Sequence, residues 1–106
     1  MIEDAHLRHY RVQLALRGTG SVGPSDVDAV VALLTQPESP QSWSCVQADP
    51  VPDGRGLQLQ ITTAGTAEQE AAQSVLDGVR SLLGLDAHFT RWVVDARTLE
   101  VTWLPG

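Results

Sequence analysis

The sequence predicts a single α+β domain over residues 1–106, in which an antiparallel sheet carries two helices on one face. Three observations predict it. A length of 106 residues suits one hydrophobic core. Two segments alternate apolar and polar residues with a period of two, which is the pattern of half-buried strands. Two further segments repeat apolar residues at intervals of three and four, as do helices that cover one side of a sheet.

The first part of the chain is predicted to form a strand and then a helix. Within residues 9–17 the apolar residues alternate with polar or small ones, and they are Tyr10, Val12, Leu14 and Leu16. After a glycine-rich turn, we expect Ser25 to cap a helix, with Asp28 three residues later, and Pro37 to end it. The apolar stripe of this helix consists of Val27, Val30, Val31 and Leu34.

The middle of the chain predicts a hairpin followed by a second helix. Residues 43–48 indicate a strand, residues 49–56 are dense in turn-forming Asp, Pro and Gly, and residues 57–62 alternate as a return strand. Thr66 is expected to open the helix, with Gln69 completing a capping box, and Gly84 to end it. The apolar stripe consists of Ala72, Val75, Leu76, Val79, Leu82 and Leu83.

The end of the chain has two apolar stretches, 89–95 and 99–104, split by the polar segment 95–98, which predicts a closing hairpin. The predicted fold is therefore a ferredoxin-like β-α-β-β-α-β arrangement with an extra C-terminal strand. Its strands alternate rather than run continuously apolar, which indicates an antiparallel sheet with both helices on one face. In this arrangement the first and third strands lie at the centre.

Charge and composition narrow the range of partners. Thirteen acidic and seven basic residues give a formal net charge of −6, which disfavours nucleic acid and anionic membrane surfaces. No apolar run approaches the roughly 20 residues of a membrane-spanning helix. Cys45 is the only cysteine, and residues 1–11 do not resemble a secretory signal. We therefore expect a soluble, cytoplasmic protein that binds neither nucleic acid nor membranes.

A glycine-rich motif is the sharpest local signal. Gly18, Gly20 and Gly23 form G-x-G-x-x-G between a predicted strand and a predicted helix, the position in which such a loop can hold a phosphate. Pro24 and Ser25 place the helix start after the last glycine, whereas a dinucleotide site needs that glycine inside the helix. The motif therefore favours an ordinary connection, with weak anion or nucleotide binding as the alternative.

Metal and catalytic chemistry find little support in the sequence. The soft metal ligands do not form paired motifs, and they are His6, His9, His88 and Cys45. We expect no metal and no cofactor, and we expect Cys45 to be a small core residue. Most carboxylates fall in the first turns of helices or in turns, where they have structural roles. Arg91 stands out because it interrupts the apolar stretch 89–95, either as an edge-strand charge or as part of a site.

Aromatic residues avoid the face of the sheet that the helices leave open. The residues expected in the middle of that face are polar, and they are His9, Arg11, Gln13, Arg17, Gln58, Gln60 and Thr62. RNA-recognition domains carry stacking aromatics there, so RNA binding is disfavoured. The three tryptophans, Trp43, Trp92 and Trp103, fall on the other strands and are expected to be core, interface or the wall of a pocket.

The order of elements is similar to that of two broad groups, small binding modules of ferredoxin-like fold and dimeric α+β barrel proteins, which include cofactor-independent monooxygenases. This resemblance carries no motif and transfers no catalytic residue. The favoured hypothesis is a non-enzymatic module that self-associates through the face of its sheet or through an edge strand and binds a partner protein or small effector. The alternative is a small cofactor-independent enzyme with an apolar cavity lined by Trp43, Trp92 or Trp103 and completed by Arg91 or His9.

Overall fold

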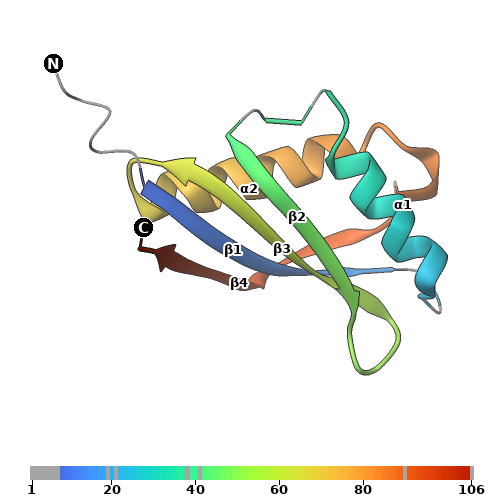
Figure 1. The fold of residues 1–106 in the computed structure, drawn as a ribbon. Helices are drawn as coiled ribbons and strands as arrows, with labels where there is room; N and C mark the ends of the chain where they lie inside the picture. The colour runs from blue at the N-terminus through green and yellow to red at the C-terminus, as the bar shows by residue number, and fades with distance from the viewer. Residues whose placement is uncertain are drawn as a thin grey trace, which may run out of the picture.

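The computed structural model describes residues 8–18, 20, 22–37, 39–40, 42–89 and 91–105, with the backbone alone at residue 88. In chain order these residues form β1 (Arg8–Arg17), α1 (Pro24–Leu34), β2 (Trp43–Pro50), β3 (Gly56–Gly65), α2 (Glu68–Leu83), the short 3-10 helix η2 (Ala87–Phe89) and β4 (Val93–Leu104). The strands form one antiparallel sheet in the order β2-β3-β1-β4 (Figure 1). The predicted α+β class with an antiparallel sheet and two helices is confirmed, and β1 and β3 are central as expected.

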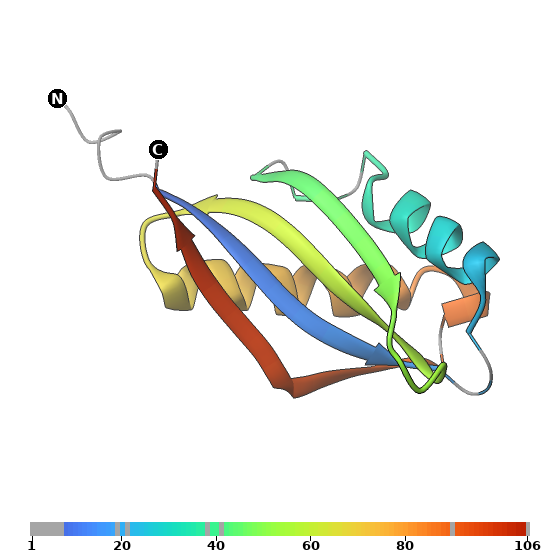
Figure 2. The same ribbon diagram turned by 60° about the horizontal axis from the view of Figure 1, so that its bottom comes forward.

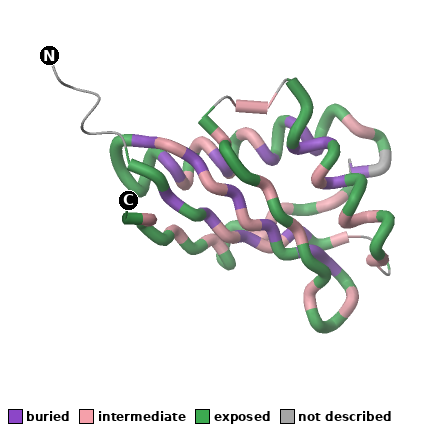
Figure 3. The backbone as a smooth tube through the Cα atoms, viewed as in Figure 1, coloured by how far each residue is buried: buried purple, intermediate pink, exposed green. Residues whose placement is uncertain are grey.

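One core lies between the sheet and the helices. Val12 pairs with Ile61 and Leu14 with Leu59 across β1 and β3, and all four side chains are fully buried. Both helices add buried side chains to the same cluster, and these are Val30, Leu33 and Leu34 from α1 and Ala71, Val75, Val79, Leu82 and Leu83 from α2. Along β1 and β3 buried residues alternate with more exposed ones (Figure 3). The helices therefore cover the predicted side of the central strands.

The helices take different positions over this core. α2 runs behind the strands and contacts β1, β3 and β4, whereas α1 packs against β2 and against α2 (Figures 1 and 2). The hairpin between β2 and β3 projects beyond the end of the sheet (Figure 2). The opposite side of the sheet is left without a helix among the described elements.

The start of α1 differs from the prediction. The N-cap is Gly23 rather than Ser25, and Pro24 is the first helical residue. Proline suits that position because its fixed φ is already helical and it lacks the N–H that would have no partner. The Gly23 N–H donates to the Oδ2 of Asp26 at 2.9 Å, so Asp26 has the capping role predicted for Asp28.

The start of α2 also differs. The N-cap is Ala67, and the predicted pairing of Thr66 with Gln69 is wrong. Instead, the N–H and hydroxyl of Thr66 donate to the two carboxylate oxygens of Glu70 at 2.9 and 3.0 Å. The end of α2 is as predicted, because Gly84 is its C-cap.

The C-terminal segment is one strand, and the predicted closing hairpin is wrong. β4 pairs with β1 through residues 93–95 and again through residues 100–104. Gln13 faces Glu100 while Ala15 faces Asp95, so residues 96–99 of β4 bulge out opposite Leu14. Within this bulge the Thr98 hydroxyl donates to the Asp95 carbonyl at 2.7 Å and accepts the Ala15 N–H at 2.8 Å. These bonds replace the lost strand pairing and let β4 continue in the same direction.

Candidate functional site

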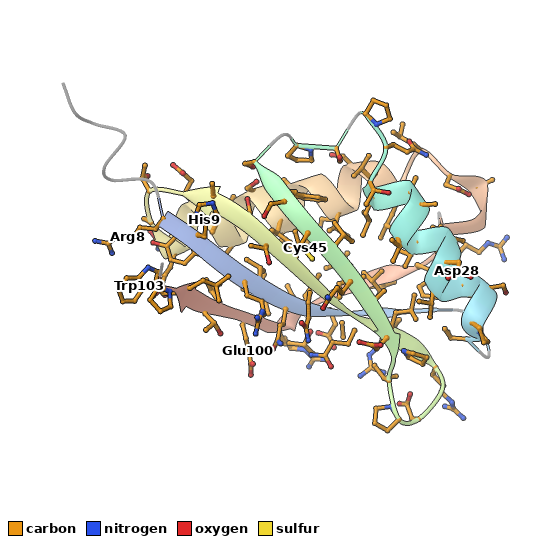
Figure 4. All side chains as sticks on the ribbon, in the orientation of Figure 1. Arg8, His9, Asp28, Cys45, Glu100 and Trp103 are labelled. Atoms are coloured by element: carbon orange, nitrogen blue, oxygen red, sulfur yellow. The ribbon has the colours of Figure 1, made fainter. Side chains whose placement is uncertain are left out.

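The side of the sheet away from the helices is a largely polar surface, which we call the open face. In β1 and β3 it consists of the residues that alternate with the core, namely His9, Arg11, Gln13, Ala15, Arg17, Gln58, Gln60, Thr62 and Ala64. Their register partners on the edge strands complete it, namely Cys45, Gln47, Asp49, Val93, Asp95, Glu100, Thr102 and Leu104. The predicted polar residues of this face are confirmed, and Figure 4 shows it from the same side as Figure 1 with His9, Cys45 and Glu100 labelled.

Charges of both signs are spread over the open face. Arg11 and Glu100 are exposed and lie on the neighbouring strands β1 and β4. Glu100 pairs with Gln13, two residues along β1 from Arg11, so the two charged residues are diagonal neighbours. Among the described side chains neither of them forms an ion pair or a hydrogen bond. Gln13 and Gln60, which face each other at the middle of the central strands, are half-buried and uncharged. The face therefore offers separated positive and negative groups around an amide-rich centre.

Asp95 organises the charges at one end of the open face. Its carboxylate lies 3.5 Å from the Nε of Arg17 and 3.4 Å from the Nε of Arg97, and it accepts the Arg97 N–H at 3.2 Å. Desolvation alone would raise the pKa of Asp95, but the hydrogen bonds and charge of Arg97 and the bond from Arg17 outweigh it and lower the pKa. Two guanidinium groups share one carboxylate, so this corner keeps an excess of positive charge.

A hollow of about 240 Å³ lies next to this corner, where the open face meets the turn of the β2–β3 hairpin. Its polar walls include Arg17, Asp53, Gln58 and Thr98, and its apolar walls include Ala15 and Val51. Ala15 pairs with Gln58 on one side and with Asp95 on the other. Its side chain is small, so the surface is recessed between those two longer side chains.

Two local features of the hairpin shape the hollow. Gly54 has a φ of +72°, which lets the turn reverse tightly, and Asp53 fixes it by accepting the Arg55 N–H at 2.9 Å. A Cβ at Gly56 would collide with the backbone carbonyl of Leu16, so only glycine allows β3 to approach β1 here. The hairpin turn is thereby held against the end of β1.

Trp43 and Trp92 lie on the core side of the molecule and not on the open face. Trp43 pairs with the buried Thr63, and its ring lies against Gly78 of α2. Its Nε1 is buried and has no hydrogen-bond partner among the described residues. Trp92 packs on Gly18 and makes an edge-to-face contact with Phe89 at 5.1 Å between ring centroids. The hollows that border these two tryptophans are different ones, and neither includes a second tryptophan.

Trp103 is separate from the other two. It pairs with Tyr10 on the core side of β4, is 53% exposed, and lies 5.6 Å from the guanidinium carbon of Arg8 in a cation–π contact. Trp43 occupies the same row at the other edge of the sheet, three strand spacings or about 14 Å away. The structure therefore does not bring the three tryptophans together around one cavity.

Arg91 and His9, the predicted polar partners of that cavity, are also far apart. Arg91 is exposed in a turn before β4 rather than inside a strand, because the chain turns after the buried Phe89 and pairing begins only at Val93. Val93 faces Arg17, at the opposite end of β1 from His9. Eight residues at about 3.3 Å each separate these ends by roughly 26 Å.

The glycine loop has most of its described N–H groups already bonded. Gly18 and Val22 donate to backbone carbonyls of the β2–β3 turn at 3.1 and 2.9 Å, and Gly23 donates to the Asp26 carboxylate. Gly20 has open space around it, and residues 19 and 21 lie outside the described residues. An anion at the start of α1 would have to displace a carboxylate, so the geometry lends the anion-loop hypothesis little support.

The soft metal ligands do not converge in the described part of the chain. Cys45 is exposed on the open face, so its expected place in the core is wrong: its strand neighbour Val46 points inward instead. His6 and the side chain of His88 lie outside the described residues. No three His, Cys, Asp or Glu side chains within the described residues are grouped so that they could hold a metal ion.

Comparison of the chain with protein-family models, curated proteins and solved structures found no significant match. No helix in the described residues has the length and apolarity needed to span a membrane.

The hollow is the feature that sequence reasoning missed. The sequence places Asp53 and Thr98 in predicted turns, and Ala15 is a small residue in an alternating strand. These residues come together because β4 bulges and the hairpin turn closes against β1, and both features depend on contacts between distant segments. In the sequence, only the charged residues of segment 95–98 indicate a polar site at this end of the sheet.

Proposed function

We propose that this protein is a non-enzymatic binding module that pairs with a second copy of itself through the open face. The observation that carries the proposal is the position of the helices. Both add their buried residues to the core on one side of the sheet, which leaves the other side with charges of both signs and half-buried amides. A surface that carries separated charges of both signs can complement its own copy in a two-fold arrangement.

The size of the open face supports pairing. Four strands about 4.8 Å apart and ten residues long at about 3.3 Å per residue make a surface of roughly 600 Å². A standard interface removes about 800 Å² of accessible surface from each partner. The accessible area of the open face exceeds its flat area because the side chains protrude from the sheet. The polar composition is that of a hydrated interface, so we expect a reversible dimer rather than an obligate one.

The edges of the sheet are less suited to pairing than its face. β4 is interrupted by the bulge at Asp95 to Thr98, and β2 has a register shift at Ser44 and ends at Pro50. Bulges and proline are features that prevent strands from adding to an edge. Self-association through the open face is therefore favoured over pairing along an edge strand.

The proposal includes the finer assignment of the fold as a ferredoxin-like arrangement. Its support is the chain order β-α-β-β-α-β together with the central position of β1 and β3. The predicted extra C-terminal strand is not part of it, since β4 is a single strand.

Light scattering on Gln13→Lys tests the dimer. Gln13 lies near the centre of the face, so a two-fold axis brings it close to its own copy, and the substitution sets like charges near each other. The dissociation constant should rise by about tenfold or more. Gln73→Lys is the matched control, because Gln73 is exposed on α2 and donates to Asp77, to which a lysine ammonium can also donate. A wild-type monomer throughout the accessible concentrations, or equal effects of both variants, contradicts the proposal.

A further inference from the structure

We infer that the hollow between the β2–β3 turn and the β4 bulge binds a small zwitterion, of which a free aliphatic α-amino acid is the simplest example. The inference goes beyond self-association and does not depend on it, although Ala15, Arg17 and Gln58 of the hollow also belong to the open face. It rests on the opposed charges of the walls, their hydrogen-bonding capacity and the apolar residues between them.

The wall on the β4 side is positive. Arg17 lines the hollow and is 59% exposed, and only its Nε is directed to Asp95, at 3.5 Å. Asp95 is shared with Arg97, so the pair of guanidinium groups is not neutralised by this one carboxylate. The terminal nitrogens of Arg17 can therefore bind a ligand carboxylate, which a planar guanidinium does with two parallel hydrogen bonds.

The wall on the hairpin side is negative. Asp53 uses one carboxylate oxygen, Oδ1, to accept the Arg55 N–H, and its other oxygen remains available to accept from an ammonium group. Asp53 and Arg17 line the same hollow without forming an ion pair with each other. The Gln58 amide lies between these walls and can donate or accept.

The volume and the apolar walls restrict the ligand further. About 240 Å³ is below the range of pockets for drug-sized molecules, so the ligand must be small. Ala15 and Val51 supply apolar contact between the charged walls, which suits an aliphatic side chain. A simple anion would leave Asp53 unmatched, and a simple cation would leave Arg17 unmatched. A molecule that carries both charges satisfies both walls.

The test is a titration of the full chain followed by amide NMR, with L-valine, N-acetyl-L-valine and L-valinamide as probes. L-valine should cause saturable shifts at Ala15, Gln58 and Thr98. Each blocked analogue lacks one charge, so it should bind about tenfold more weakly. The absence of saturable shifts at millimolar L-valine, or tighter binding of either blocked analogue, overturns the inference.

Two matched variants distinguish binding in the hollow from a general effect of net charge. Asp53→Asn keeps the oxygen that accepts the Arg55 N–H but removes the charge, so it should weaken L-valine binding about tenfold and leave N-acetyl-L-valine unaffected. Asp49→Asn makes the same change in net charge at a neighbouring position of the open face that does not line the hollow, and it should leave L-valine binding unchanged. Equal weakening by both variants overturns the inference. A monomer that binds L-valine in this pattern refutes self-association and supports the zwitterion site.

Discussion

Gly78, in the interior of α2, offers a sharp test of how the helix packs on the sheet. A Cβ at this position would lie 2.6 Å from the Cζ2 of Trp43, 3.0 Å from its Cη2 and 3.3 Å from the Cγ of Pro40. The indole ring is rigid and is held at the start of β2 between the sheet and the helix. The substitution Gly78→Ala therefore has two opposite effects on stability.

The magnitudes of these effects predict a change of sign. Alanine is favoured over glycine inside a helix by about 1 kcal/mol. Overpacking against an aromatic ring costs about 2 kcal/mol, so Gly78→Ala should destabilise the wild-type protein by about 1 kcal/mol. In a Trp43→Ala background the clash is gone and the same change should stabilise by about 1 kcal/mol, which makes the coupling between the two positions about 2 kcal/mol.

Urea unfolding of the four proteins of this cycle, followed by far-UV circular dichroism, measures the coupling. Circular dichroism is preferred to fluorescence because one of the tryptophans is replaced. If Gly78→Ala stabilises both backgrounds by the same amount, Trp43 does not lie against α2 and the packing described above is wrong.

Three further changes test the strand contacts around the open face. Thr98→Val should destabilise the protein by about 1 kcal/mol because it leaves the Ala15 N–H without its acceptor. Thr98→Ser keeps the hydroxyl and should not destabilise it. The urea midpoints of the two variants test this difference. Gly56→Ala should destabilise by about 3 kcal/mol, measured by thermal unfolding, because the new Cβ meets the Leu16 carbonyl in a central strand that cannot shift. The pKa of Asp95 is lowered in the folded protein, so ionised Asp95 stabilises the fold at neutral pH. This stabilisation is lost as the pH falls through and below about 4. Urea midpoints of wild type and Asp95→Asn should therefore differ at neutral pH and converge in acid, and a constant difference contradicts the assignment.

The central strands and both helices could be predicted because their signals are local. Val12 and Leu14 alternate with polar residues, and this period fixes which side of β1 is buried without knowledge of its neighbours. The paired Leu59 and Ile61 repeat the pattern in β3. The helix caps were less predictable because several candidates compete at each start: Pro24 moved the first cap to Gly23.

The C-terminal strand and the hollow could not be predicted because distant residues decide them. The polar segment at Asp95 has the composition of a turn, but Thr98 bonds to Ala15 of another strand, so β4 bends at the bulge and pairs with β1 again beyond it (Figure 2). The direction of Trp43 depends in the same way on Gly78, which provides the space for its ring. Alternation in residues 43–48 was too irregular to show this, because β2 shifts register between Trp43 and Cys45.

The central claim is that the open face meets its own copy, and Cys45 allows a direct measurement. This cysteine is the only one in the chain and is exposed on the open face. A nitroxide attached to it in one sample can be mixed with nitrogen-15-labelled protein, so that any relaxation effect arises between molecules. We predict broadening at the amides of Gln13 and Gln60 in the middle of the face. Broadening confined to α1 and α2, or none at concentrations that favour association, would contradict the claim.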